Sequence, residues 1–174
     1  MKLKYYSIPF LIAFVACCIH ACKGQQKTLS GVIIFAQGDV TIIQNDVNKP
    51  AGIGANVNPN DIIATGNQSI AVVQIADRAI AHIGSNSRVV VQSLLDTSVT
   101  LYLEKGEVIS KVERLQKGQE YSVKARSVVA SVRGTQFLVK ADEKIGKVAV
   151  HTGSVSVKPV IEAEEVEVAE IKET

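Results

Sequence analysis

Short runs of alternating apolar and polar residues fill the chain from Leu29 to Lys158, with Gly, Asn, Asp or Pro between them about every ten residues. Val99, Leu101 and Leu103 show the alternation clearly, because alternate residues of an extended strand share one face. No stretch of this region keeps the period near 3.6 that an amphipathic helix requires. The pattern therefore predicts one all-β domain over residues 29–158, made of many short strands and without large helices downstream of the N-terminal segment.

Turn-forming residues predict where these strands end. Gln37-Gly38 separates two apolar runs and predicts a hairpin, whereas the polar stretch from Gln44 to Asn60 predicts the longest loop. Alternation resumes on both sides of Arg133-Gly134-Thr135, which predicts two short strands joined by a glycine turn. Arg133 interrupts an apolar run, and we interpret its side chain as a donor to turn carbonyls or to a carboxylate; the alternative is contact with a ligand.

The composition of the predicted domain indicates a narrow core. Its only aromatic residues are Phe35, Tyr102, Tyr121 and Phe137, and the chain has no tryptophan. Small aliphatic side chains must therefore fill most of the interior. Stacked short hairpins, as in a β-solenoid or roll, suit that composition better than an immunoglobulin-like sandwich.

The N-terminus has the pattern of an export signal. Lys2 and Lys4 precede an uncharged, mostly apolar stretch from Tyr5 to Ile19. The alternative is a transmembrane anchor over Tyr5 to Cys22, which is about long enough to span a bilayer.

The end of this segment, Ile19-His20-Ala21-Cys22, resembles a bacterial lipobox, in which the cysteine is diacylated before cleavage. The resemblance implies a signal peptide over residues 1–21, a lipidated Cys22 and a polar tether over residues 22–28. Cys17 is the alternative lipidation site. A lipid anchor implies attachment to a membrane, with the outer membrane or the periplasmic face favoured over the cytoplasm.

Cysteine positions and charge narrow the function further. All three cysteines lie between Cys17 and Cys22, so lipidation of Cys22 leaves the domain without a disulfide, a thiol nucleophile or a thiolate metal site. Removing Lys2 and Lys4 from 19 basic residues leaves 17, against 17 acidic residues. The remaining lysines are scattered, which argues against a nucleic-acid partner. The tail over residues 159–174 is acidic.

Several motifs together resemble the FecR domain family. The run from Ala130 to Val139 is similar to its VRGT-x-F-x-V signature, the run from Asn60 to Ala71 to its G-D-x-I-x-T-G-x-x-S-x-A motif, and the run from Val148 to Val157 to its closing pattern. Most matched side chains are of turn-forming types, so a structural role is the first interpretation. The matched residues are Asp61, Thr65, Gly66, Ser69, Arg133, Gly134, Thr135, Phe137 and Gly153.

The FecR resemblance implies a place in envelope signalling. The resemblance implies the arrangement of FecR-type regulators, in which a cytoplasmic segment is followed by one membrane span and a periplasmic domain. Such regulators sense the occupancy of a transporter and control a sigma factor. Only Met1 to Lys4 precede the apolar run here, so direct control of a sigma factor is not expected.

Residues for catalysis do not come together in the sequence. His82 and His151 are far apart and lack metal-ligand spacing, so we expect no enzyme activity, no metal and no cofactor. The sequence thus predicts a non-enzymatic lipoprotein of the bacterial cell envelope that binds or scaffolds a protein or a glycan. The alternatives are a signalling adaptor for a membrane regulator or receptor, and a hydrolase whose activity depends on His82 or His151.

Overall fold

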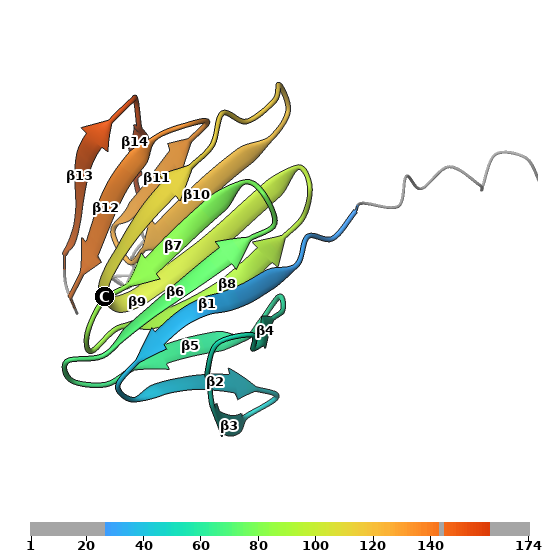
Figure 1. Cartoon of the computed structure of the whole chain (residues 1–174). Helices are drawn as coiled ribbons and strands as arrows, with labels where there is room; N and C mark the ends of the chain where they lie inside the picture. The colour runs from blue at the N-terminus through green and yellow to red at the C-terminus, as the bar shows by residue number, and fades with distance from the viewer. Residues whose placement is uncertain (1–26, 143–144, 161–174) are drawn as a thin grey trace, which may run out of the picture.

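The computed structural model describes residues 27–142 and 145–160, which form fourteen β-strands and no helix (Figure 1). The all-β class predicted from the sequence is therefore confirmed. The proposed signal peptide, both candidate lipidation sites and residues 161–174 of the acidic tail lie outside the described residues. The strands are β1 (Gly31–Gln37), β2 (Val40–Gln44), β3 (Val47–Pro50), β4 (Asn56–Val57), β5 (Ile62–Thr65), β6 (Ile70–Ile75), β7 (Ala79–Ile83), β8 (Arg88–Leu94), β9 (Ser98–Val112), β10 (Glu120–Ala125), β11 (Val128–Val132), β12 (Gln136–Ala141), β13 (Gly146–Thr152) and β14 (Ser156–Pro159).

The strands form one sheet that curls on itself, and β9 joins its two halves. The first part of β9, up to Lys105, pairs with β8 and β10. The rest, from Gly106, pairs with β7 and β12. We call the two halves the first layer (β4, β1, β6, β7, the end of β9, β12, β13) and the second layer (β3, β2, β5, β8, the start of β9, β10, β11, β14).

The core lies between the two layers and is aliphatic, as the composition predicts. Alternate residues of each strand point inward; in β11 these are Val128, Ala130 and Val132. Tyr121 and Phe137 are the only aromatic side chains among the buried residues that the structure describes. Their rings meet edge to face, with centroids 6.2 Å apart.

The chain changes layer at positions where the sequence pattern predicts simple hairpins. The predicted hairpin at Gln37-Gly38 is wrong, because β1 pairs with β6 and β4 whereas β2 pairs with β5 and β3. The turn at Gly134 does join two strands, but β11 lies in the second layer and β12 in the first. A glycine that turns the chain thus passes it from one layer to the other.

Two other expectations need refinement. The stretch predicted as the longest loop contains β3 and β4, which form one edge of the second and of the first layer respectively. The structure shows a curled sheet. The more specific prediction of a β-solenoid or roll is not confirmed. Strand pairing is antiparallel except between β10 and β9.

Candidate functional site

Four layer crossings lie side by side and form what we call the first corner row: residues 38–39, 66–69, 84–87 and 105–107. Main-chain hydrogen bonds join neighbouring crossings, from Gly66 N to Asp39 O (2.8 Å) and from Gly84 N to Glu107 O (3.0 Å). Gly66 of the FecR-like motif lies here. A Cβ atom at Gly66 would lie 3.1 Å from the Cβ of Asp39, so the crossings approach closely.

Buried hydroxyl groups hold the first corner row together. The Ser69 hydroxyl accepts a hydrogen bond from Asp39 N (2.8 Å), and the Ser87 hydroxyl accepts one from Glu107 N (3.0 Å). The Thr65 hydroxyl donates to Gly84 O (2.6 Å) and accepts from Ser87 N (3.0 Å). Thr65 and Ser69 of the motif therefore bond to the main chain of a neighbouring crossing, which leaves these hydroxyls engaged within the fold.

Asp61 closes the turn that precedes β5. Its Oδ2 atom accepts hydrogen bonds from Asn58 N (2.8 Å) and from Gln44 Nε2 (2.7 Å), and its side chain is buried. The carboxylate thus closes the turn from its C-terminal end, by accepting the main-chain N–H of the residue three positions earlier.

The second corner row lies at the opposite ends of the strands and contains residues 112–114, 133–135 and 153–154. Thr135 and Val112 exchange two main-chain hydrogen bonds (3.0 and 3.1 Å), and the Thr135 hydroxyl donates to Ser154 O (2.9 Å). Gly153 has a positive φ of 98°, and a Cβ there would lie 2.9 Å from the Thr135 hydroxyl. Gly134, also with positive φ, approaches the main chain of Arg114 in the same way. Phe137 follows this crossing and is buried in the core.

Arg133 differs from the other signature residues because its side chain is exposed. No ion pair or side-chain hydrogen bond joins its guanidinium to another group within the described ranges, whereas its carbonyl accepts a hydrogen bond from Leu115 N (2.9 Å). The interpretation of this side chain as a donor to turn carbonyls therefore finds no support in the geometry. The alternative, contact with a ligand, stays open.

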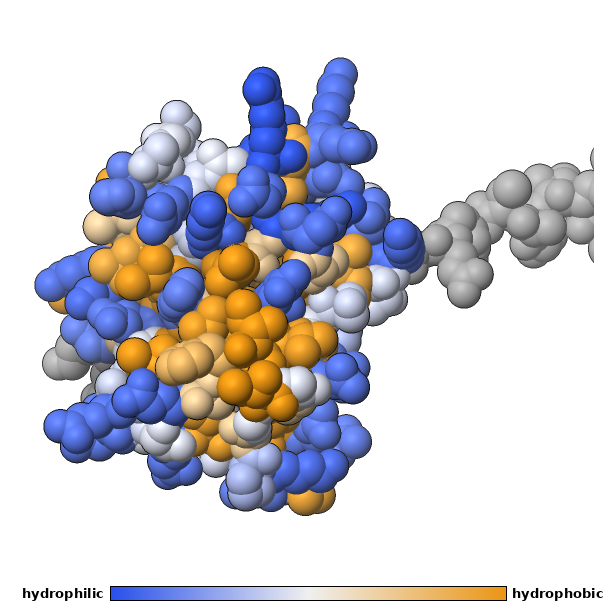
Figure 2. Space-filling model, viewed as in Figure 1, coloured by the Kyte–Doolittle hydropathy of each residue, from blue (hydrophilic) through white to orange (hydrophobic). Residues whose placement is uncertain are grey.

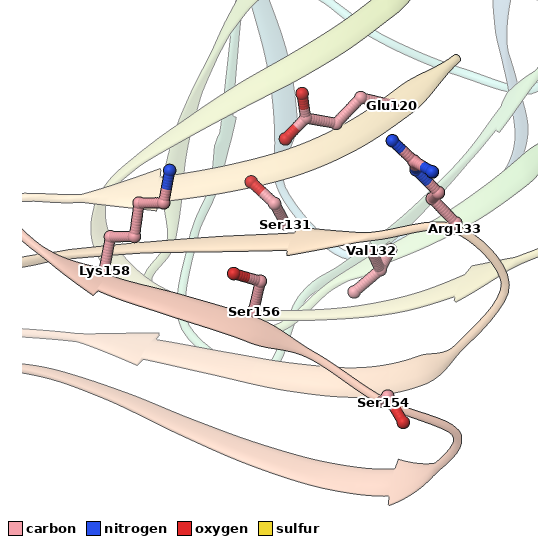
Figure 3. Close-up of a pocket in the computed structure, with 7 residues that line it drawn as sticks. All are labelled: Glu120, Ser131, Val132, Arg133, Ser154, Ser156 and Lys158. Atoms are coloured by element: carbon pink, nitrogen blue, oxygen red, sulfur yellow. The ribbon is translucent and has the colours of Figure 1, made fainter. Parts of the chain in front are cut away.

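Arg133 lies at one end of an open hollow of about 420 Å³ on the outer face of the second layer (Figure 3). We call it the polar hollow. Its lining comes from β10, β11, β14 and the second corner row: Glu120, Ser131, Val132, Arg133, Ser154, Ser156 and Lys158.

The polar hollow combines hydroxyl groups with separated charges. Ser131 and Ser156 are cross-strand partners and lie between Arg133 and Lys158, as Figure 3 shows. Glu120, Arg133 and Lys158 are exposed, and in the part of the chain that the structure describes none of the three forms an ion pair. The hollow therefore presents two free cations, one free carboxylate and free hydroxyl groups on a hydrogen-bonded sheet.

The β-strands beneath the polar hollow are fixed by a buried contact between the layers. Tyr121 of β10 shares a hydrogen bond of 2.9 Å with the Ser110 hydroxyl of β9, and both residues are buried. Burial raises the pKa of Tyr121 above its ordinary value, and the hydrogen bond to Ser110 opposes this rise only in part. The phenol thus stays protonated and helps to hold the sheet under the hollow.

The two histidines that the sequence singles out lie apart from this site. His82 is exposed on the outer face of β7, and His151 is exposed near the end of β13. Residues 27–142 and 145–160 contain no cluster of three or more His, Cys, Asp or Glu side chains that could hold a metal. The absence of an enzymatic activity stays a prediction.

An apolar patch lies on the other layer. Ile34, Phe35 and Ile70 are 40%, 43% and 41% exposed on β1 and β6. Figure 2 shows apolar side chains gathered over this part of the surface. Such a patch is typical of a contact surface, although isolated apolar residues are common on any protein.

The fold and the site define an all-β domain with an open polar hollow on its second layer. The chain belongs to the FecR family: the family described as FecR protein matches residues 61–156, which is more than half of the sequence. The resemblance inferred from the sequence motifs is thereby confirmed.

A solved structure shows a further likeness. It is the crystal structure of a candidate anti-sigma factor from Parabacteroides distasonis, with a TM-score of 0.49 and 23% sequence identity over 57% of this chain and 50% of that one. The chain thus spans half the length of that protein. Among curated proteins, none matches this sequence.

The described ranges contain no helix long and apolar enough to cross a lipid bilayer.

Proposed function

We propose that this protein is a non-enzymatic binding or scaffolding module of the bacterial cell envelope, attached to a membrane through a diacylated Cys22. Membership of the FecR family and the lipobox-like sequence support the location. The observation that carries the binding role is the polar hollow, whose free charged and hydroxyl groups lie on a sheet held together by two corner rows. The strands that carry these groups are already ordered, so a ligand has to order only the side chains and not the backbone.

The expected anchor is tested by labelling cells with radioactive palmitate. The wild-type protein and the Cys17→Ala variant should be labelled, whereas Cys22→Ala should not be labelled. Label retained in Cys22→Ala and lost in Cys17→Ala would move the anchor to the alternative site. Label absent from all three would contradict the lipoprotein assignment.

A second candidate function is that of a signalling adaptor, and the free edges of β13 and β14 favour it. Within the described residues each of these strands pairs with one neighbour only, β12 and β11 respectively. Val150 and Val157 point toward the interior side of these strands, yet they are 49% and 50% exposed, because none of the described strands pairs with the outer edge of β13 or β14. A receptor or regulator could add a strand to such an edge.

Capture of partners from envelope extracts distinguishes the adaptor from a general scaffold. An adaptor should retain one membrane protein at a constant ratio, and Val150→Lys should abolish that retention because it places a charge on the apolar edge. Ile53→Lys is the matched control, since Ile53 is 71% exposed and lies outside both edge strands. Equal retention by both variants would exclude this edge as the binding surface.

A further inference from the structure

We propose that the polar hollow binds an acidic oligosaccharide, that is, a chain of sugars bearing carboxylate groups. This inference rests on the proposed binding function and names the class of ligand. Three observations support it: the distance between the two cations, the serine hydroxyls that have no hydrogen-bond partner among the described residues, and the main chain of β11, which is already hydrogen-bonded on both sides.

The two cations of the hollow are too far apart for one small anion. Lys158 lies opposite Val129, and Arg133 is four residues further along the same strand direction. At a rise of roughly 3.3 Å per residue, their positions are separated by about 13 Å along the strands. An elongated ligand with more than one anionic group can contact both ends, whereas a single phosphate ion cannot bridge them without bending both side chains inward.

The hydroxyl groups between the cations are available to a ligand. On the neighbouring strands, the hydroxyls of Thr100 and Ser122 form a hydrogen bond with each other (3.2 Å). Ser131 and Ser156 continue the same cross-strand row and, among the described residues, their hydroxyls have no hydrogen-bond partner. Hydroxyl groups both donate and accept, which matches the hydroxyls of a sugar ring. Glu120 adds an acceptor at the Arg133 end.

An extended peptide is a poorer fit than a saccharide. The main chain of β11 is hydrogen-bonded to β10 on one side and to β14 on the other, so it offers no ladder to an added strand. The lining also has no apolar pocket for a peptide side chain, because Val132 is buried and the other lining residues are polar. Between β10 and β14, recognition in the hollow therefore uses side-chain hydroxyls and charges.

A neutral sugar is a poorer fit for the opposite reason. None of the described residues that line the hollow has an aromatic ring against which an uncharged sugar could stack. Its strongest groups are the guanidinium of Arg133 and the ammonium of Lys158, and hydrogen bonds from such groups to carboxylates are about twice as strong as neutral ones. A neutral chain would leave both cations unused.

The test is titration of the full-length protein, in detergent, with oligogalacturonates of one to six units, followed by calorimetry and by amide chemical shifts. We expect saturable binding that shifts the amides of Ser131, Arg133 and Ser156. The tetramer should bind at least tenfold more tightly than the monomer, because only the longer chain reaches both cations. Arg133→Gln and Lys158→Gln should each weaken binding at least fivefold, and the double variant should abolish it.

Lys111→Gln is the matched control, because it removes the same charge from an exposed position on the first layer and should leave binding unchanged. Three further probes separate the alternatives: maltohexaose, inorganic phosphate and tetraglutamate. The proposal would be overturned if any of these probes bound as tightly as the oligogalacturonates, or if no oligogalacturonate bound. It would also be overturned if Lys111→Gln weakened binding as much as Arg133→Gln. A protein that is labelled by palmitate and captures an envelope partner, yet ignores oligogalacturonates, would retain the proposed function while losing this ligand.

Discussion

Replacing Gly106 by alanine is expected to destabilise the protein by about 3 kcal/mol or more, the sum of a backbone cost and a packing cost. Gly106 lies at the point where β9 passes from one layer to the other, with a φ of 91° that a residue with a Cβ adopts reluctantly. A Cβ at this position would also meet the Ser87 hydroxyl and lie 2.5 Å from the Ser87 Cα. Ser87 cannot retreat, because its hydroxyl is bonded to the main chain of Glu107.

Two other glycines separate the two costs. Gly118 has a φ of 90° and nothing within 4 Å of an added Cβ, so Gly118→Ala should cost only about 1 kcal/mol, the backbone part. Gly52 has neither a positive φ nor a close neighbour, and Gly52→Ala should be nearly neutral. Urea unfolding followed by circular dichroism gives the three values. A Gly106→Ala variant no less stable than Gly118→Ala would show that the corner row is not tightly packed.

The corner rows also show what the sequence can and cannot predict about this fold. Alternation assigns inward and outward residues within a strand correctly, as in β11, because that information is local. Layer crossings are different. Gly38 has positive φ as a hairpin glycine would, so the local pattern cannot tell a hairpin from a crossing; only the distant partners β5 and β6 decide.

A repeat in the sequence could have revealed the first corner row. Asn67-Gln68-Ser69 and Ser85-Asn86-Ser87 form the same turn, with φ values of 51° and 52° at the middle residue and a buried serine at the end. In each case the serine hydroxyl accepts a hydrogen bond from the main chain of a neighbouring crossing, the preceding one for Ser69 and the following one for Ser87. Two turns with the same backbone conformation, each ending in a buried serine, indicate that the two segments occupy equivalent positions in the sheet.

The polar hollow could be predicted only in part. The family signature identifies Arg133, but its position in an apolar run suggests a buried hydrogen-bond donor. The sequence does not show that the side chain at this end of β11 is exposed to solvent. Ser131 and Ser156 lie within motif runs but are not among the matched residues, and Lys158 lies outside these runs. They come together only because β14 pairs with β11 across an interval that includes β12 and β13. Long-range pairing of this kind creates the site and is not encoded locally.

Removal of the Tyr121 side chain is expected to cost about 3–5 kcal/mol, as for other large aromatic residues in protein cores. Tyr121 is 1% exposed, packs edge to face on Phe137 of the first layer and bonds to Ser110. Tyr121→Ala would therefore remove a large contact between the layers below the polar hollow. Urea unfolding measures the loss, and a cost below about 1 kcal/mol would mean that the layers do not depend on this contact.

Smaller changes at Tyr121 separate its ring from its hydroxyl. Tyr121→Phe leaves the buried Ser110 hydroxyl without its partner and should cost about 1–2 kcal/mol, whereas adding Ser110→Ala to it should recover part of that loss. The raised pKa gives a second readout. Since the folded protein holds the phenol proton more tightly than the unfolded chain, this contribution is complete below about pH 10, the ordinary pKa of tyrosine, and falls as the pH rises above it. Stability should therefore decline less steeply above pH 10 in Tyr121→Phe than in the wild type, and identical slopes would show that the phenol is not held protonated by the fold.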